Sequence, residues 1–291
     1  MATIKNADFL INNDGSIYHI SLKPEELADT VIVVGDPDRV EKISCYFSSI
    51  ETKVQNREFI GHTGYYNRKR LTVLSTGIGT DNIDIVMNEL DALVNVDFAT
   101  RTVKENKKSL DIIRIGTSGA VQAEIPVSSF ALSTMGIGFD NLLHYYAFDP
   151  NMVDNTMCEA FMTHTGWNPD LSKPYFVKGS QKLITLFEKG MHKGLTVTAP
   201  GFYGPQGRVL RLGLHDPELN EKIRSFRYGD ERIINFEMET SALYSLGALL
   251  GHNMVTVCAL IANRVTNEYS VDHKKVIQNL VEVVLDRITA S

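Results

Sequence analysis

Short apolar runs alternate with longer amphipathic segments along the 291-residue chain, and several of these runs end at glycine turns. The first run, 31–34, ends at Gly35, and the second, 70–75, is followed by the turn Gly77-Ile78-Gly79. Apolar residues at helical spacing follow that turn: Ile83, Val86, Leu90 and Leu93. A strand that ends at a turn and leads into a helix packed on the same sheet is typical of α/β proteins.

The same alternation continues to the C-terminus. It predicts further strands at 110–115, 130–135, 195–199 and 254–261. It predicts helices at 37–43, 183–189, 239–250 and 271–289. No Pro-, Gly- or Ser-rich linker and no internal repeat divides the sequence, so we expect one domain over residues 1–291 with a mostly parallel or mixed central sheet. Ligands of such sheets lie beyond the strand ends, where the glycine turns are.

Composition and charge exclude several classes of function. The chain is 43% hydrophobic and 22% charged, which is enough for a sizeable core. A formal net charge of -6 argues against a general nucleic-acid binder. The longest apolar segment, 248–262, is too short to span a membrane, and no signal-peptide pattern precedes the first strand. The three cysteines are far apart and odd in number, which indicates reduced thiols. We therefore expect a soluble, cytoplasmic protein with no nucleic-acid or membrane partner.

Several common site motifs are missing. Gly77-Ile78-Gly79 and Gly136-Ile137-Gly138 begin like dinucleotide fingerprints, but Asn82 and Asn141 stand where the third glycine belongs. There is no P-loop motif, no pair of histidines at zinc-ligand spacing and no nucleophile-elbow motif. These absences disfavour a nicotinamide dehydrogenase and a zinc enzyme.

Arginines beside glycine-rich turns are the main chemical signal. Gly35 and Arg39 come just after the first strand, where free main-chain N–H groups can also face an anion. Arg114 ends another predicted strand and precedes the hydroxyl of Thr117, and Arg57 lies in a polar segment. Because guanidinium groups match phosphate oxygens, the three arginines could neutralise one phosphate dianion. Taken singly, each is better explained as an ordinary surface or ion-paired arginine.

Two other segments suit a nucleoside. Glu237 and Glu239 lie where a strand enters a helix, and a carboxylate there can accept both vicinal hydroxyls of a ribose. The alternative is an acidic helix N-terminus stabilised by the macrodipole. Phe202 precedes the pair Gln206 and Arg208, and a glutamine presents a donor and an acceptor to a base edge. The alternative is a glycine-rich surface loop with incidental polar residues.

Seven segments occur in a fixed order: GDPDRV (35–40), REF (57–59), STGIG (75–79), RIGTSGA (114–120), FYGPQGR (202–208), FEMET (236–240) and NR (263–264). Together they resemble the nucleoside phosphorylase superfamily, and most closely its uridine phosphorylase branch. The resemblance extends from about Tyr18 to the C-terminal helix. It implies a single-domain, three-layer α/β/α fold with a mixed central sheet.

The resemblance also implies a role for each matching residue. Phosphate would be bound by Gly35, Arg39, Arg114 and Thr117, joined by Arg57 of a neighbouring subunit. Ribose would contact Met238 and Glu239 and, again from a neighbour, His19 at its 5′-hydroxyl. The base would contact Phe202, Gln206, Arg208 and Ile261. A monovalent cation, potassium, would bind at the subunit interface near Glu58 and Ser75. No cofactor is implied, and inorganic phosphate is the co-substrate.

The implied reaction is the cleavage of uridine by phosphate to uracil and ribose 1-phosphate. Purine-directed relatives use an acid after the penultimate strand to protonate the base. Here residues 262–265 read Ala-Asn-Arg-Val, without an aspartate, which favours a pyrimidine. The small Ala262 could admit thymine nucleosides. The alternatives are a phosphorylase of other or broader specificity (thymidine, deoxyuridine or purine nucleosides), a nucleosidase that uses water, and a non-catalytic nucleoside-binding protein.

The resemblance further implies a homodimer as the functional unit, because His19 and Arg57 would serve the neighbour's site. Many members stack three such pairs into a hexamer. Residues 100–109, TRTVKENKKS, are an insertion relative to compact bacterial members. We expect its basic residues to form a bulky solvated segment that blocks such stacking, or else an ordinary surface loop: Arg101, Lys104, Lys107 and Lys108. The dimer is favoured and the hexamer stays open.

Overall fold

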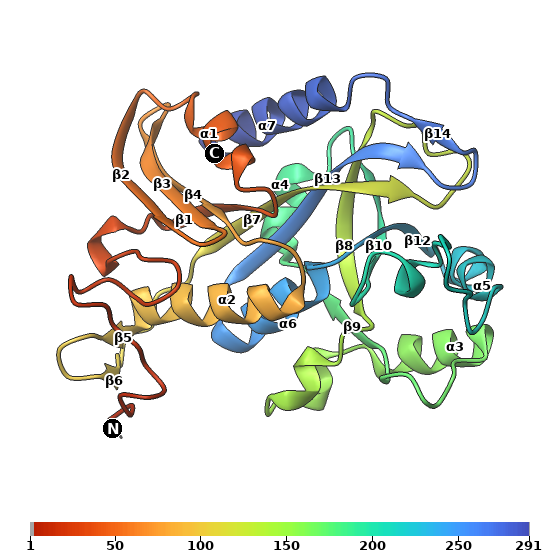
Figure 1. Ribbon diagram of the computed structural model, residues 1–291, viewed down its shortest axis with the longest axis horizontal. Coiled ribbons are helices and arrows are strands. Elements are labelled where there is room, and N and C mark those ends of the chain that lie inside the picture. Colours follow the sequence, from red (N-terminus) through yellow and green to blue (C-terminus); the bar gives the residue numbers. More distant parts are fainter. Residues whose placement is uncertain (1–2, 291) are drawn as a thin grey trace.

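The computed structural model describes residues 3–290 and contains a large sheet with helices on both faces (Figure 1). Its strands are β1 (Thr30–Val34), β2 (Ser49–Asn56), β3 (Phe59–Tyr66), β4 (Lys69–Ser75), β7 (Asp111–Ala120), β8 (Phe130–Gly138), β9 (Tyr175–Lys178), β10 (His192–Thr198), β11 (Arg227–Tyr228), β12 (Glu231–Glu237), β13 (Asn253–Asn263) and β14 (Glu268–Tyr269). The order across the sheet is β11-β12-β10-β8-β13-β7-β1-β4-β3-β2, with β9 paired to β8 and β14 to β13.

The sheet is mixed, as predicted. Strand β1 lies parallel to β4 and β7, and β13 lies parallel to β7 but antiparallel to β8. Strands β2, β3 and β4 form an antiparallel meander at one edge. All five residues of β1 are buried, which fits a strand covered on both faces. The mixed sheet between two helical layers confirms the predicted three-layer α/β/α fold.

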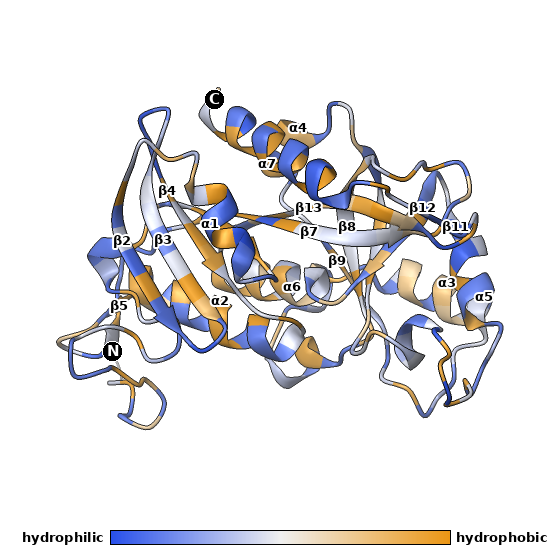
Figure 2. Cartoon of the chain, turned by 45° about the horizontal axis from the view of Figure 1, so that its top comes forward, coloured by the Kyte–Doolittle hydropathy of each residue, from blue (hydrophilic) through white to orange (hydrophobic). Residues whose placement is uncertain are grey.

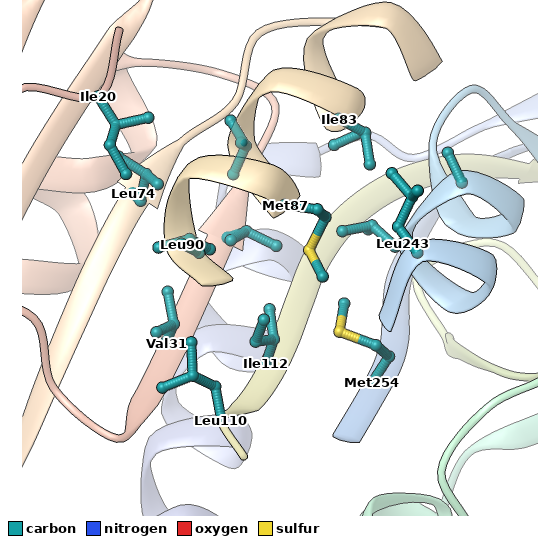
Figure 3. Close-up of a cluster of buried hydrophobic side chains, with 14 of the residues drawn as sticks. Ile20, Val31, Leu74, Ile83, Met87, Leu90, Leu110, Ile112, Leu243 and Met254 are labelled. Atoms are coloured by element: carbon teal, nitrogen blue, oxygen red, sulfur yellow. The ribbon is translucent and has the colours of Figure 1, made fainter. Parts of the chain in front are cut away.

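The helices are α1 (Asp38–Ser44), α2 (Thr80–Asn95), α3 (Asn155–Thr165), α4 (Gln181–Phe187), α5 (Leu219–Ser225), α6 (Thr240–Leu250) and α7 (His273–Thr289). Helices α2 and α6 pack on one face of the sheet through an apolar cluster (Figure 3) that includes Met87, Leu90, Val31, Ile112 and Leu243. Burying one such side chain contributes about 1.5–3 kcal/mol. This cluster fixes the N-termini of both helices beside the strand ends.

Helix α7 covers the opposite face, together with α1 and α4. Its buried residues recur every three or four positions, and Figure 2 shows hydrophobic and hydrophilic residues alternating along it: Val276, Leu280, Val284 and Ile288. This spacing is the amphipathic pattern that the sequence showed for 271–289. Within residues 3–290, no helix has both the length and the hydropathy needed to cross a membrane.

Most predicted elements are present with small shifts in their ends. Helix α1 begins at Asp38 rather than Pro37, a difference of one residue, and the Asp36 carboxylate accepts the Asp38 main-chain N–H (3.1 Å), as expected of the predicted cap. Helix α4 ends at Phe187 instead of 189. The hairpin of β2 and β3 and helices α3 and α5 were not predicted.

The insertion at 100–109 makes more contacts with the rest of the chain than its many charged residues suggested. Its strand β6 (Thr102–Val103) pairs with β5 (Val96–Asp97), which lies just before the insertion, at the same corner of the molecule as the N-terminal segment (Figure 1). The Arg101 guanidinium lies over the Phe9 ring (4.9 Å) and donates to the Phe9 carbonyl. Lys104 and Lys108 bond to the Val94 carbonyl and to Asp29. Lys104, Lys107 and Lys108 are all exposed, as expected of a solvated basic segment, whereas Arg101 is half-buried.

Candidate active site

A cleft of about 1160 Å³ opens at the carboxyl ends of β1, β7 and β12. Strands β1 and β7 are parallel, so the turns that follow them meet at one edge of the sheet. The end of β12 reaches the same place because it pairs antiparallel with the end of β7, Asn235 with Ala120 and Phe236 with Gly119. Most of the predicted site residues line this cleft: Gly35, Arg39, Glu58, Arg114, Thr117, Phe202, Gln206, Arg208, Met238, Glu239 and Ile261. His19, Arg57 and Ser75, although described, are not among its lining residues.

Arg39 reaches the cleft from α1 and is buried. Its Nη1 donates to the Ile115 carbonyl at 3.1 Å, which ties the helix to β7, and its Nη2 lies 4.0 Å from the Asp36 carboxylate. Burial lowers the pKa of the Arg39 guanidinium despite that carboxylate. A Cβ at Gly35 would lie 3.3 Å from the Gly77 carbonyl, so the turns after β1 and β4 pack closely beside this arginine.

Arg114 lies at the floor of the cleft on β7. Its Nη2 pairs with the Glu239 carboxylate, and its Nη1 lies 3.5 Å from Glu237 Oε2 and 3.7 Å from Cys258 Sγ. Its Nε is buried without a partner among the described residues. Burial by itself would lower the pKa of this guanidinium, but Glu239 and Glu237 raise it above its usual value. A buried cation therefore stays charged where an anion can reach it.

Glu237 and Glu239 occupy the predicted junction of strand and helix. Glu239 lies just before α6, and its Oε1 accepts the Gly79 main-chain N–H at 2.9 Å. Glu237 ends β12 and accepts the main-chain N–H groups of Glu239 and Thr240 (both 2.9 Å) and the Thr198 hydroxyl (2.6 Å). Burial raises the pKa of Glu237. The sequence offered both carboxylates for the ribose, and the resemblance chose Glu239. In the structure Glu237 instead holds the turn that carries Glu239.

The base-binding candidates form one connected group. Arg208 donates to Gln206 Oε1 (2.5 Å) and to the Phe202 carbonyl (2.8 Å), and its guanidinium lies 3.8 Å from the Phe202 ring centre. Gln206 is almost fully buried, and its main-chain carbonyl accepts a hydrogen bond from Arg264 Nη2 at 2.5 Å. An amide and a guanidinium thus face the cleft together beside an aromatic ring.

Arg264 is a site residue that sequence reasoning missed, although the segment NR was part of the resemblance. It lines the cleft, lies 5.3 Å from the Phe236 ring centre, and has a buried Nη1 without a partner among the described residues. Burial, helped by Arg208, lowers its pKa to about 10. The signal in the sequence was an arginine at the end of an apolar strand, the same context that identified Arg114.

His19 and Arg57 lie together but outside the cleft of their own chain. Arg57 is exposed in the β2–β3 turn with a φ of 53°, and the preceding Asn56 donates its amide to the His19 carbonyl at 2.9 Å. The His19 ring is 6.2 Å from the ring of Phe59. The two residues that the resemblance assigns to a neighbour's site therefore share one surface region.

Glu58 and Ser75, the predicted cation ligands, are in contact, but through the main-chain carbonyl of Glu58. Ser75 Oγ donates to the Glu58 carbonyl (2.5 Å) and accepts the Ile60 main-chain N–H (2.7 Å). Ser75 is fully buried, whereas the Glu58 side chain lines the cleft next to Gly77. Among residues 3–290 there is no cluster of three or more histidine, cysteine or acidic side chains suited to a metal ion.

Comparison with curated proteins finds relatives over most of the chain. A uridine phosphorylase of Thermococcus kodakarensis is 30% identical over 258 residues, which are 88% of this chain and 80% of the relative. A DeoD-type purine nucleoside phosphorylase of Bacillus cereus is 28% identical over 273 residues, 92% of this chain and 97% of the relative. Relatives named for pyrimidine and for purine substrates therefore both match.

Solved structures and a family model agree with this result. A Trypanosoma brucei nucleoside phosphorylase described as showing uridine phosphorylase activity has a TM-score of 0.87 at 28% identity, covering 98% of this chain and 100% of its own. A Toxoplasma gondii purine nucleoside phosphorylase has a TM-score of 0.66 at 19% identity over 97% of this chain and 98% of its own, which shows the shared fold alone. The family model of the phosphorylase superfamily matches residues 29–290. The chain belongs to the phosphorylase superfamily.

Proposed function

We propose that this protein is a uridine phosphorylase that cleaves uridine with inorganic phosphate to uracil and ribose 1-phosphate. The observation that carries the proposal is that two groups of residues line one cleft. The first is Arg39 and Arg114, both buried, with Thr117, and the second is the hydrogen-bonded pair of Gln206 and Arg208. The first group suits a phosphate dianion and the second suits the edge of a pyrimidine. The named relatives with uridine phosphorylase activity support the same choice.

The chemistry needs positioning and charge rather than a covalent enzyme intermediate. The bond between C1′ of the ribose and N1 of the base breaks, and its electron pair leaves with the uracil, which then takes up a proton. A phosphate oxygen forms the new bond to C1′. Arg39, Arg114 and the Gly35 main chain hold the phosphate below the sugar, where its charge stabilises the cationic ribose. Glu239 orients the ribose hydroxyls, and Met238 packs against its apolar face.

The choice of a pyrimidine rests on the base end of the cleft. Gln206 Oε1 accepts from Arg208, so the Gln206 amide nitrogen is oriented to donate to a uracil carbonyl while Arg208 stabilises the anionic leaving group. Ile261 and Phe202 pack on the ring. Ala262 is small and lines the cleft, so thymine nucleosides are included in the proposed specificity.

We further propose that the functional unit is a homodimer, with a hexamer as the alternative. His19 and Arg57 lie together outside their own cleft, which is where residues that serve a neighbour's site would be. Potassium at the interface stays a proposal: Ser75 Oγ already has two partners in its own chain, so a cation needs further oxygen ligands from the Glu58 side chain or from a second subunit. No step of the reaction is assigned to that ion.

The reaction is proposed to belong to pyrimidine nucleoside salvage in the cytoplasm. All three cysteines, at positions 45, 158 and 258, are free thiols in the described chain, as expected for a reducing compartment. Burial raises the pKa of the Cys258 thiol, beside Arg114, to about 11, and the proposed reaction gives this thiol no role.

An assay of base release with and without phosphate tests the proposal. Uridine, thymidine, deoxyuridine, inosine and adenosine are offered to the purified protein, and free base and ribose 1-phosphate are measured. We expect uracil and ribose 1-phosphate in equal amounts from uridine, only when phosphate is present, and poor cleavage of both purine nucleosides. Base release without phosphate would identify a nucleosidase, faster cleavage of inosine would identify a purine enzyme, and nucleoside binding without turnover would identify a binding protein.

A further inference from the structure

The carboxylate of Glu89, on α2, binds the segment that carries His19. Its Oε1 accepts the His19 main-chain N–H at 3.0 Å, and its Oε2 accepts the Ile20 N–H at 2.8 Å. Oε1 also lies 2.7 Å from His19 Nδ1. One carboxylate therefore fixes both the main chain and the ring of a histidine that is 70 residues away in the sequence.

Other groups hold the same histidine from different sides. The Asn56 amide donates to the His19 carbonyl at 2.9 Å and to the Tyr18 carbonyl at 3.2 Å. The rings of Tyr18 and Phe59 meet the imidazole edge to face, with centres 4.7 and 6.2 Å away. His19 Nε2, in contrast, has no hydrogen-bond partner among residues 3–290. The ring is thus held through one nitrogen while the other stays available.

The hydrogen-bond pattern determines which nitrogen carries the proton. A carboxylate that already receives two main-chain N–H groups acts as an acceptor, so His19 Nδ1 donates to it. In the neutral imidazole, Nε2 is then an acceptor with a fixed direction. A carboxylate behind a histidine commonly sets the tautomer and orientation of the ring in this way.

We propose that Glu89 is a positioning residue that fixes His19 in the Nδ1–H tautomer, so that Nε2 accepts a hydrogen bond from the nucleoside 5′-hydroxyl in the neighbouring subunit. This inference rests on the proposed function and on the contact with that hydroxyl that the resemblance implies for His19. Glu89 itself touches no substrate; it acts through the ring that it orients.

A second carboxylate–histidine contact on the same helix shows what a purely structural pair looks like. His252 Nε2 lies 3.2 Å from the Asp91 carboxylate without a hydrogen bond to it, and His252 Nδ1 accepts the Leu110 main-chain N–H at 3.1 Å. The His252 side chain is fully buried, and both of its nitrogens face the protein. The side chain of His19 is 24% exposed, and its second nitrogen faces no group of its own described chain. This difference separates a histidine that stabilises the fold from one that is presented to a ligand.

The test compares uridine with 5′-deoxyuridine, which lacks only the hydroxyl in question. Glu89→Gln removes one acceptor oxygen, because an amide presents a single oxygen to three donors. We expect the ratio of kcat/KM for uridine to that for 5′-deoxyuridine to fall by about fivefold, toward the ratio measured for His19→Ala. Adding Glu89→Gln to His19→Ala should change this ratio no further.

Asp91→Asn is the matched control. Asp91 lies on α2, like Glu89, and the substitution removes the carboxylate that contacts His252. Its substrate ratio should equal that of the unmodified protein. If Glu89→Gln instead lowers kcat/KM for both nucleosides by the same factor, Glu89 has only a structural role and the proposal is wrong. If the unmodified protein cleaves neither nucleoside, the proposed function is wrong. Whether Glu89 positions the His19 ring is then decided by measuring which ring nitrogen carries the proton.

The tautomer has a readout that needs no turnover. In ¹⁵N-histidine-labelled protein, the ring resonances of His19, assigned by their loss in His19→Ala, should show the proton on Nδ1. In Glu89→Gln they should shift toward the Nε2–H form or toward exchange between the two. A proton on Nε2 in the unmodified protein would overturn the proposal whatever the kinetics show.

Discussion

Arg114 reaches the cleft floor because its neighbours are small. A Cβ at Gly116 would lie against Arg114 Nη1 and 2.9 Å from Cys258 Sγ, so any side chain there would displace the guanidinium. The glycine of the segment RIGTSGA is therefore required by packing and not by a turn, because it lies inside β7. A glycine in a strand often marks such a close approach.

At the same scale, Arg39→Ala and Arg114→Ala should each raise the KM for phosphate. Each variant loses charge-assisted hydrogen bonds worth about 1.5–3 kcal/mol, roughly a ten- to hundredfold effect. Initial rates at varied phosphate and saturating uridine measure it. Arg232→Ala is the control, since this arginine pairs with Glu124 on the surface and lies outside the cleft. An unchanged phosphate KM in both cleft variants would remove them from the phosphate site.

Among the elements, those with a strong pattern of their own could be predicted from sequence. Helix α7 shows its apolar stripe, β1 is a run of β-branched residues, and β13 is a mostly apolar run. The hairpin of β2 and β3 could not be predicted, because Ser49–Asn56 is a polar edge strand with mostly exposed residues. Such a strand exists only because β3 pairs with it.

The same limit applies to the site. Many cleft residues lie near the carboxyl ends of strands or just after them, and ligands of α/β sheets bind at those ends, so the sequence pattern could point to them. His19 and Arg57 lie outside that region, in the N-terminal segment and in the β2–β3 turn, and only the resemblance pointed to His19. The prediction of one domain over residues 1–291 also stays a prediction.

The packing of α7 gives a prediction at the scale of the element. Leu280 is fully buried against the sheet, so Leu280→Ala should lower the free energy of unfolding by about 2–5 kcal/mol. Chemical unfolding at one fixed protein concentration measures this, because subunit association also affects stability. Asn279→Ala, next to it on the exposed face, should change the value by about 0.5 kcal/mol or less. Equal effects of the two substitutions would contradict the assigned core face.

For the whole molecule, the shared site predicts complementation between two inactive variants. Subunits with Arg57→Ala and subunits with Glu239→Ala, dissociated and reassembled together, should regain part of the activity. In a mixed dimer one cleft inherits both defects and the other inherits neither. Sedimentation at assay concentrations separates monomer, dimer and hexamer by mass. If exchange of subunits is confirmed and no activity returns, Arg57 serves its own chain.

The position of β13 has a consequence for biosynthesis. The strand fills the place between β7 and β8, yet both of those neighbours leave the ribosome far earlier. At about 5–20 residues per second, the wait is on the order of ten seconds. During this time β7 and β8 have unpaired edges, which are templates for pairing with other nascent chains. A message truncated before the codon for Asn253 would therefore yield aggregates instead of a smaller folded protein, and slower translation of the last segment would lengthen the dependence on chaperones.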